Sequence, residues 1–262
     1  MEQCEWTLRL PNPKPLSPRE GRHMVARLAD DLPGLEAIFN YDGGKALSGA
    51  PAETLKALSD SGAGADLITR VNNDAAWPRV RVGALGSTLR ITAVHAELID
   101  AVDAAALPIA ALLRREMGAA PELRRSATQC FAVETDRPFH YECAALLPVR
   151  GVDATARFLA SSRDAQAETI RRRILDGLDR QARILGIDLP AIDSDLETIE
   201  FETPRDCPFV LRERAGRSVP VNKAVLIPRV RFIAHVRLGG HWAVGHATGR
   251  HNGRIWYARE GR

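Results

Sequence analysis

The sequence lacks the features that would place the protein in a membrane or outside the cell. It has no run of about 18 apolar residues, the length that a transmembrane helix needs. Its first residues, MEQCEWTLRL, lack the basic and apolar segments of a secretory signal. Its four cysteines, Cys4, Cys130, Cys143 and Cys207, are far apart, with no CxxC pair. We therefore expect reduced thiols in a cytoplasmic protein with no membrane partner.

Motifs for bound metals and nucleotides are also absent from the sequence. The cysteines have no zinc-type spacing, and His241, His246 and His251 recur without a cysteine or carboxylate beside them. No GxxxxGK[ST] or GxGxxG pattern occurs, which disfavours a nucleoside-triphosphate or dinucleotide site. We therefore expect no metal site and no cofactor.

Lysine is scarce, because only four of the 36 basic residues are lysine and the other 32 are arginine. The codon bias of a GC-rich genome explains such a ratio, but it does not explain where the arginines lie. Residues 203–262 contain twelve Lys or Arg and three acids, whereas the rest of the chain has more acids than bases. Since the planar guanidinium fork suits phosphate groups, this clustering predicts a polyanion-binding face.

The order of the expected elements predicts an α+β fold. The first half is expected to contain a strand at 5–10, a helix from Ser17 to about Leu32, a hairpin within 78–94 and a helix at 95–117. The second half is expected to repeat this order, with strands at 126–135 and 139–149, a long helix at 153–186, strands at 196–202 and 224–237, and a final strand pair. We predict two ferredoxin-like (βαββαβ, RRM-like) domains in tandem, residues 1–122 and 123–262, with an inserted arginine-rich helix (153–186) and a C-terminal glycine-rich loop.

Basic side chains are expected to line one face of the strand LIPRVRFIAHVRL, residues 226–238. With a strand period of two, Arg229, Arg231, His235 and Arg237 share a face with Ile233, and the alternate residues are apolar. Like charges on alternate positions repel one another, so a facing anion would stabilise the strand. This predicts an anion-binding face, and a solvated outer face without a ligand is the alternative.

The long helix is expected to carry a second basic face. Ala167, Ile170, Ile174, Leu178, Ala182 and Leu185 form an apolar stripe at helical spacing. Opposite this stripe lie Arg172, Arg173, Arg180 and Arg183, with Asp176 among them. Such a face suits the phosphates of a duplex stem, although charged helix faces are often only solvated.

The last part of the chain is rich in glycine and in basic residues. Glycines at 239, 240, 245, 249 and 253 interrupt strand-like residues in HVRLGGHWAVGHATGRHNGRIWYAREGR. Glycine lets a backbone approach a bulky ligand, and its turns can bind anions through N–H groups. The predicted RNA-binding residues here are Gly239, Gly240, Gly245, Gly249, Arg250, His251 and Arg254.

Four of these features together resemble the RAMP superfamily of CRISPR-associated proteins. They are the ferredoxin-like first half, the hairpin segment LGSTLRI (85–91), the arginine-rich helix and the glycine-rich end. The segment LRLPNPKP (8–15) also resembles the first strand and turn of the type I-F processing enzyme. Within that superfamily the chain is most similar to the repeat-processing endoribonucleases, in particular those that mature CRISPR RNA in type IV systems. The resemblance implies binding of a CRISPR repeat hairpin, cleavage of precursor CRISPR RNA at the stem base, and retention of the product beside other effector subunits.

The resemblance also implies a chemistry that needs no metal. A ribose 2′-OH attacks the adjacent phosphate and leaves a 2′,3′-cyclic phosphate, with proton transfer by acid–base groups and charge stabilisation by cations. The family's catalytic histidine lies in or just after the first helix, where this sequence has only His23, with Arg22 and Arg27 nearby. An alignment of the prolines of LRLPNPKP instead puts that histidine near Ala29 or Asp30. The alternatives are a site of arginines alone and a role for His235.

Three functional hypotheses follow from the sequence. The first is a metal-independent endoribonuclease that processes CRISPR repeat RNA. The second is a non-catalytic RNA-binding subunit of a CRISPR effector complex, with the same fold and charge but no acid–base residues. The third is a general nucleic-acid-binding α+β protein whose glycine-rich end is only a hairpin.

Overall fold

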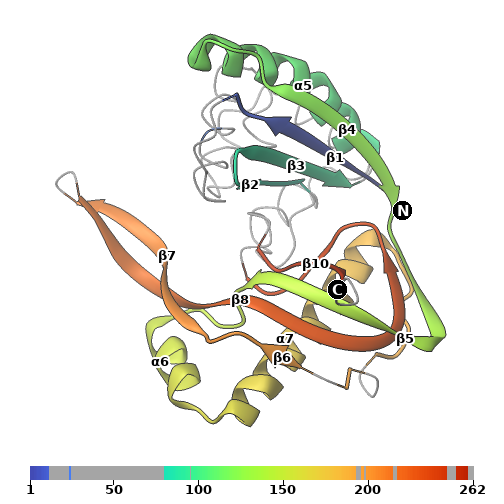
Figure 1. Ribbon diagram of the computed structural model, residues 1–262, viewed down its shortest axis with the longest axis vertical. Helices are drawn as coiled ribbons and strands as arrows, with labels where there is room; N and C mark the ends of the chain where they lie inside the picture. The colour runs from blue at the N-terminus through green and yellow to red at the C-terminus, as the bar shows by residue number, and fades with distance from the viewer. Residues whose placement is uncertain are drawn as a thin grey trace. The chain divides into compact units, whose positions relative to one another are not determined.

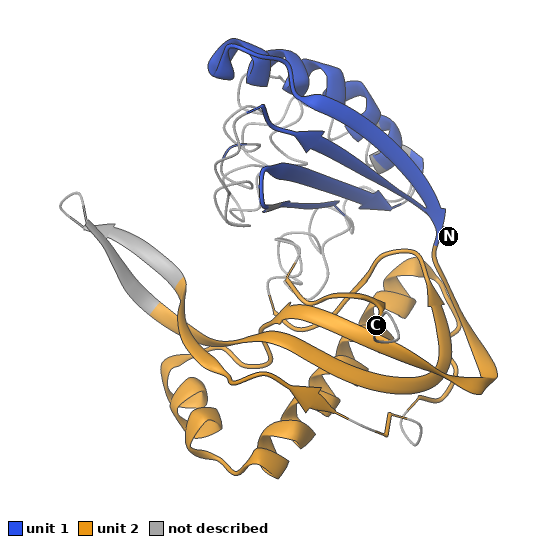
Figure 2. Ribbon diagram, viewed as in Figure 1, with its two compact units in different colours: residues 1–129, 249–251 blue, residues 130–248, 252–262 orange. Residues whose placement is uncertain are grey.

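The computed structural model describes residues 1–11, 24, 80–94, 96–192, 196–197, 199–214, 217–246 and 252–258. The chain divides into two compact units, one of residues 1–129 and one that begins at Cys130 (Figure 2). Each unit has its own β-sheet and its own hydrophobic core.

The first unit contains a four-stranded antiparallel sheet. Its strands are β1 (Glu2–Arg9), β2 (Val80–Leu85), β3 (Thr88–Val94) and β4 (Glu122–Gln129), in the order β2-β3-β1-β4, and helix α5 (Ala96–Met117) connects β3 to β4 (Figure 1). The predictions of a hairpin within 78–94 and a helix at 95–117 are confirmed. The helix expected from Ser17 to Leu32 lies outside the described residues except for Met24, which is helical and packs on the core.

Alternation in β1 and helical spacing in α5 build the core of this unit. Cys4, Trp6 and Leu8 alternate along β1 and are buried, because a strand sends every second side chain to the same face. In α5 apolar side chains recur every three or four residues and are buried. Examples are Val102, Ala106, Ile109 and Leu113.

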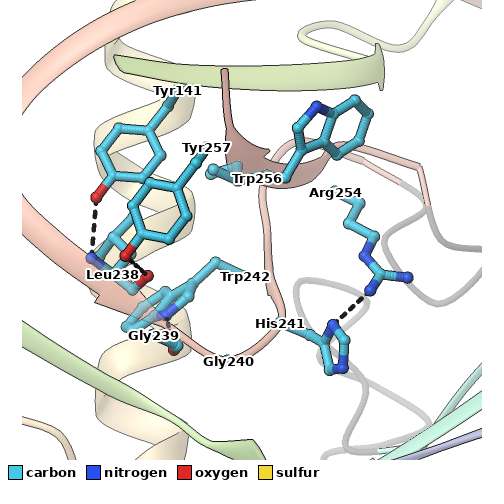
Figure 3. A pocket seen from close by; sticks show the side chains of 10 residues that line it. Tyr141, Leu238, Gly239, Gly240, His241, Trp242, Arg254, Trp256 and Tyr257 are labelled. Atoms are coloured by element: carbon cyan, nitrogen blue, oxygen red, sulfur yellow. Dashed lines mark hydrogen bonds between the residues drawn. The ribbon is translucent and has the colours of Figure 1, made fainter. Parts of the chain in front are cut away.

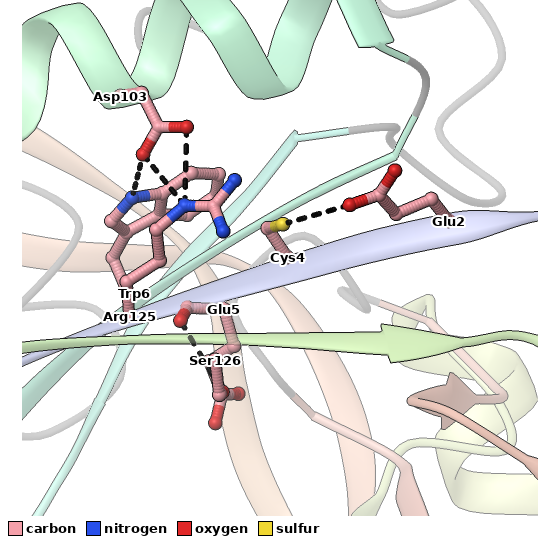
Figure 4. A network of polar contacts seen from close by, with 7 residues as sticks. All are labelled: Glu2, Cys4, Glu5, Trp6, Asp103, Arg125 and Ser126. Atoms are coloured by element: carbon pink, nitrogen blue, oxygen red, sulfur yellow. Dashed lines mark hydrogen bonds and ion pairs between the residues drawn. The ribbon is translucent and has the colours of Figure 1, made fainter.

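A polar network joins β4 to β1 and α5 (Figure 4). Asp103 Oδ1 accepts hydrogen bonds of 2.8 Å from both Trp6 Nε1 and Arg125 Nε. Burial alone would raise the pKa of Asp103, but the hydrogen bonds from Arg125 and Trp6 outweigh it and hold the pKa below its ordinary value. Because β4 also pairs with β1 from Glu122 onward, the first compact unit extends to Gln129. The domain boundary after residue 122 stays a prediction.

The second unit contains a six-stranded antiparallel sheet and two helices (Figure 1). Its elements are β5 (Phe131–Leu146), α6 (Val152–Ala160), α7 (Arg163–Leu185), β6 (Glu200–Phe201), β7 (Arg205–Arg214), β8 (Arg217–Gly239), β9 (Trp242–Ala243) and β10 (Arg254–Tyr257). The strand order is β6-β8-β5-β10-β9, and β7 forms a hairpin with β8. The expected final strand pair is therefore confirmed as β9 and β10.

The apolar stripe predicted for the long helix is confirmed, because it packs in the core of the second unit. Ile170, Ile174, Leu178, Ala182 and Leu185 are all almost completely buried. Ala167 is partly buried beside them. On the sheet side the same core contains Tyr141 and Cys143 of β5, Val230 and Phe232 of β8, and Ile255 of β10.

The prediction of one helix over 153–186 is wrong, because the segment contains the two helices α6 and α7. Ser161 ends α6 with an extended backbone, and Ser162 begins α7, its side chain accepting a hydrogen bond of 3.3 Å from the backbone N of Ala165. A serine at this position satisfies one of the N–H groups that the first turn of a helix leaves unpaired. At the other end Gly186, with a φ of 62°, closes α7 in the left-handed conformation.

The α+β class with antiparallel sheets is confirmed. The first unit supplies all four strands and one helix of the βαββαβ pattern in its described residues. In the second unit, the described elements place both helices between β5 and β6, so they do not repeat that order. The second ferredoxin-like domain therefore stays a prediction. No helix among the described residues has both the length and the apolar character to cross a membrane.

Candidate nucleic-acid interface

The outer face of β8 carries the basic side chains that the alternation predicts. Val230, Phe232, Ala234, Val236 and Leu238 are buried in the core. The intervening Arg229, Arg231 and Arg237 are exposed to different degrees, and His235 is half-buried. The period of two therefore assigns the two faces of this strand correctly.

An acid of the neighbouring strand lies between two of these arginines. Glu142 of β5 is paired with Arg231 in the sheet register, and its carboxylate lies 3.1 Å from Arg229 Nε and 3.5 Å from Arg231 Nε. Glu202 lies 3.7 Å from Arg229. Protein carboxylates therefore already relieve part of the repulsion between Arg229 and Arg231. The part of Arg229, Arg231 and His235 in RNA binding stays a prediction.

Arg237 has a different environment from the other two arginines. Its guanidinium carbon lies 5.6 Å from the centre of the Phe131 ring, within cation–π range. The same ring covers Gly239, where a Cβ atom would overlap the ring atoms. Gly239 therefore allows Phe131 to lie close to the backbone beneath an exposed guanidinium.

The basic face of α7 is partly neutralised within the helix. Arg172 Nε donates to Glu168 Oε1 at 2.8 Å, and Arg183 pairs with Asp179 one turn earlier. Glu168 and Asp179 therefore act on this face in addition to Asp176. Exposed pairs of this kind contribute little free energy, so phosphate groups can displace the carboxylates.

Three arginines are close enough to the half-buried His246 to lower its pKa. Arg173 Nε donates a hydrogen bond of 2.9 Å to the carbonyl oxygen of Pro148. The backbone N–H of His246 donates one of 2.9 Å to the carbonyl oxygen of Leu147. These two bonds hold α7 and the glycine-rich segment against the chain that leads to Arg150. We call Arg150, Arg173, Arg180 and His246 the His246 cluster.

Electrostatics within the His246 cluster favour the neutral imidazole. Burial lowers the pKa of His246, and the nearby Arg173, Arg150 and Arg180 lower it further, to about 4. Burial likewise lowers the pKa of Arg173, with Arg180 and Arg150 adding to the effect and Asp176 opposing it. A neutral imidazole among three guanidinium groups can accept a hydrogen bond beside a bound phosphate.

Close packing explains Gly245 and Gly253 near the C-terminus. Gly253 has a φ of 68°, and a Cβ there would overlap the carbonyl oxygen of Val244. The two segments are tied by a hydrogen bond of 2.9 Å from Val244 N to Gly253 O. Gly245, with a φ of 87°, lies against Leu146 and Leu147 in the same way. Gly249, Arg250 and His251 lie outside the described residues.

A pocket of about 240 Å³ lies between the end of β8 and strand β10 (Figure 3). Its lining includes Tyr141, Leu238, Gly239, Gly240, His241, Trp242, Arg254, Ile255, Trp256 and Tyr257. We call it the β8–β10 pocket. Arg254 Nη2 lies 2.5 Å from His241 Nδ1, and the Tyr257 hydroxyl donates to the carbonyl oxygen of Leu238 at 2.8 Å. The pocket therefore combines aromatic rings with a guanidinium group.

The structure brings together some predicted site residues and leaves others separate. Gly239, Gly240 and Arg254 meet in the β8–β10 pocket, and Arg173 and Arg180 meet in the His246 cluster. The predicted catalytic residues His23, Arg22 and Arg27 lie outside the described residues. Within the described part of the chain, no group of three or more His, Cys, Asp and Glu side chains is placed to hold a metal ion.

Sequence reasoning missed Arg150, His246, Trp256 and Tyr257. Arg150 and His246 come from segments almost a hundred positions apart, so no spacing pattern links them to α7. The aromatic pair had a usable signal, because two large aromatic residues lie just after Arg254 in a short terminal strand.

Comparisons with known proteins agree with this fold. A solved structure described as "Csf5, CRISPR-Cas type IV Cas6 crRNA endonuclease" is similar over 99% of this chain and 100% of that chain, with 20% identity and a TM-score of 0.68. A second, described as "Crystal structure of Cas6b", is similar over 98% of this chain and 100% of that chain, with 11% identity and a TM-score of 0.55. At these identities the likeness concerns the fold. No curated protein matches the sequence.

The sequence as a whole matches one family model. The model describes the type IV CRISPR-associated endonuclease Csf5, and the match covers residues 1–260. This span includes both compact units and the glycine-rich end. The chain therefore belongs to the type IV CRISPR-associated endonuclease Csf5 family.

Proposed function

We propose that the protein is a metal-independent endoribonuclease that binds a CRISPR repeat hairpin and cleaves precursor CRISPR RNA at the base of the stem. The observation that carries this proposal is the family match over residues 1–260. The structurally similar Csf5 protein is named as a crRNA endonuclease, which supports the same substrate. The basic and aromatic side chains of the second unit supply groups suited to RNA.

The proposed RNA-binding residues belong to α7, to β8 and to the glycine-rich end of the sequence. They are Arg172, Arg173, Arg180 and Arg183 of α7, Arg229, Arg231, His235 and Arg237 of β8, and Gly239, Gly240, Gly245, Gly249, Arg250, His251 and Arg254 of the glycine-rich end. Arg150 and His246 join them through the His246 cluster. Arginine suits these positions because its fork binds phosphate oxygens in pairs.

The proposed chemistry is transesterification by the RNA's own 2′-OH. His23 transfers a proton, while Arg22 and Arg27 stabilise the charge that develops on the phosphorane. The products are a 2′,3′-cyclic phosphate and a 5′-OH, and no metal or cofactor takes part. The product remains bound, and the protein serves as a subunit beside other effector proteins. The alternative is a non-catalytic RNA-binding subunit of such a complex.

A cleavage assay in EDTA tests this proposal. Purified protein is mixed with a repeat hairpin RNA, and the ends of any fragments are identified by mass spectrometry. We expect a single cut at the stem base with a cyclic-phosphate end, and we expect His23→Ala to reduce the rate by at least about 100-fold. Tight binding without scission would favour the structural subunit, and an unimpaired His23→Ala variant would remove His23 from the site.

A further inference from the structure

The β8–β10 pocket has the size of a small planar group. Its volume of about 240 Å³ is less than the roughly 300–1,000 Å³ of pockets that hold drug-sized ligands. Leu238 and the backbone at Gly239 and Gly240 form one side, where Gly240 adopts a φ of 81°. The walls also include the aromatic rings of β5, β9 and β10 (Figure 3).

The aromatic rings of β10 are large and exposed, and one of them is held in place. Trp256 is 40% exposed and Tyr257 is 44% exposed, although burial of either ring would stabilise the fold. The Tyr257 ring packs at 5.4 Å from Tyr141 and 5.7 Å from Phe139, and its hydroxyl is bound to Leu238. A rigid ring with an open face loses little side-chain entropy when a second ring stacks on it.

Positive charge lies beside these rings. Arg254 precedes Trp256 by two residues, so both project to the same face of β10. Its guanidinium is oriented by His241 at 2.5 Å, and Figure 3 shows this pair at the edge of the pocket. A cation fixed next to exposed aromatic faces is the combination that proteins use to bind single-stranded nucleic acid.

We propose that the β8–β10 pocket binds one unpaired nucleotide that flanks the hairpin stem, with its base against Trp256 and its phosphate at Arg254. The inference rests on the proposed function, because the hairpin supplies the nucleotide. A paired base is already stacked within the stem and cannot enter, whereas an unpaired base can be splayed out onto a ring. The pocket is thus a specificity element for the single-stranded flank and not for the stem.

Two RNAs separate the flank from the stem in the test. One is a repeat hairpin with short unpaired flanks on both sides, and the other is the same hairpin with a blunt stem. Both carry 2′-deoxy substitutions at the stem base so that they are not cut. Affinity is measured by fluorescence anisotropy for the wild type, Trp256→Ala, Trp256→Phe and the control Val152→Ala, whose side chain is exposed on α6.

We expect Trp256→Ala to weaken binding of the flanked hairpin by at least about fivefold, the loss that one stacked base gives. Trp256→Phe should keep most of the affinity, and Val152→Ala should match the wild type. Binding of the blunt hairpin should be the same for all four proteins, which also shows that the variants are folded. Equal affinity of wild type and Trp256→Ala for the flanked hairpin, or an equal loss on both RNAs, overturns the inference. Failure of the wild type to bind either RNA overturns the proposed function as well.

Discussion

At the scale of single residues, the glycine-rich end serves the packing of its own backbone. Gly253 combines a φ of 68° with a position where a Cβ would overlap the carbonyl of Val244. We expect Gly253→Ala to lower the free energy of unfolding by about 3 kcal/mol, since left-handed strain and the overlap both contribute. Urea denaturation measures this change.

Gly186→Ala is the matched control for that variant. Gly186 has a similar φ of 62°, but a Cβ there meets no atom within 4 Å. Only the backbone strain remains, so we expect a loss of about 1 kcal/mol. If both variants lose the same free energy of unfolding, the close approach of Val244 is not the reason that position 253 requires glycine.

His246 gives the stability of the protein a specific dependence on pH. Its pKa is about 4 in the folded protein, against about 6.5 in an unfolded chain. Between these two values the unfolded chain binds more protons, so stability falls as the pH decreases through this window. His246→Gln removes this loss. We compare the free energy of unfolding of the variant with that of the wild type at each pH. On going from pH 7.5 to pH 4.5, this difference should shift by about 2 kcal/mol in favour of the variant.

Urea denaturation at the two pH values measures the difference between wild type and His246→Gln. Carboxylates protonate equally in both proteins, so their contributions cancel in the comparison. Parallel loss of stability in the two proteins on acidification would show that His246 is not held neutral by burial and by Arg150, Arg173 and Arg180.

At the scale of elements, α7 carries arginines that are open to RNA. Arg172 is exposed and forms an exposed pair with Glu168, and Arg180 lies two turns further along the helix. We expect the double variant Arg172→Ala with Arg180→Ala to weaken hairpin binding. The slope of log affinity against log salt should become shallower by about 1.5 to 2, because fewer counterions are released.

Arg157→Ala in α6 is the control for the α7 variant, because Arg157 is exposed on a helix outside the His246 cluster. Affinities are compared over a series of salt concentrations. If the double variant and the control give the same slope as the wild type, the basic face of α7 is only solvated.

The same elements show how far sequence patterns extend. The buried stripe of α7 and the alternation of β8 were predictable, because each depends on a period along one segment. The break between α6 and α7 also had a signal, since Ser162 followed by Asp164 is typical of a helix start. The pairing of Glu142 with Arg229 and Arg231 had none, because it depends on the register between β5 and β8.

At the scale of the whole chain, the excess of basic residues in 203–262 was visible in the sequence, but its meaning changes in the fold. Part of that charge is paired within the second unit, as Lys223 is with Asp206 and Arg229 is with Glu142. Other cations of the candidate interface, such as Arg150 and Arg173, come from outside residues 203–262. The charge of a segment therefore predicted a nucleic-acid-binding protein but not the residues that would form the binding surface.

Cross-linking tests most directly whether the second unit holds the RNA. A repeat hairpin that contains 4-thiouridine in its stem and flanks is bound to the full-length protein and irradiated, and the attached peptides are identified by mass spectrometry. We expect cross-linked peptides from α7 and from the segment that spans the end of β8 and β10. Cross-links confined to residues 1–129 would contradict the proposed binding surface.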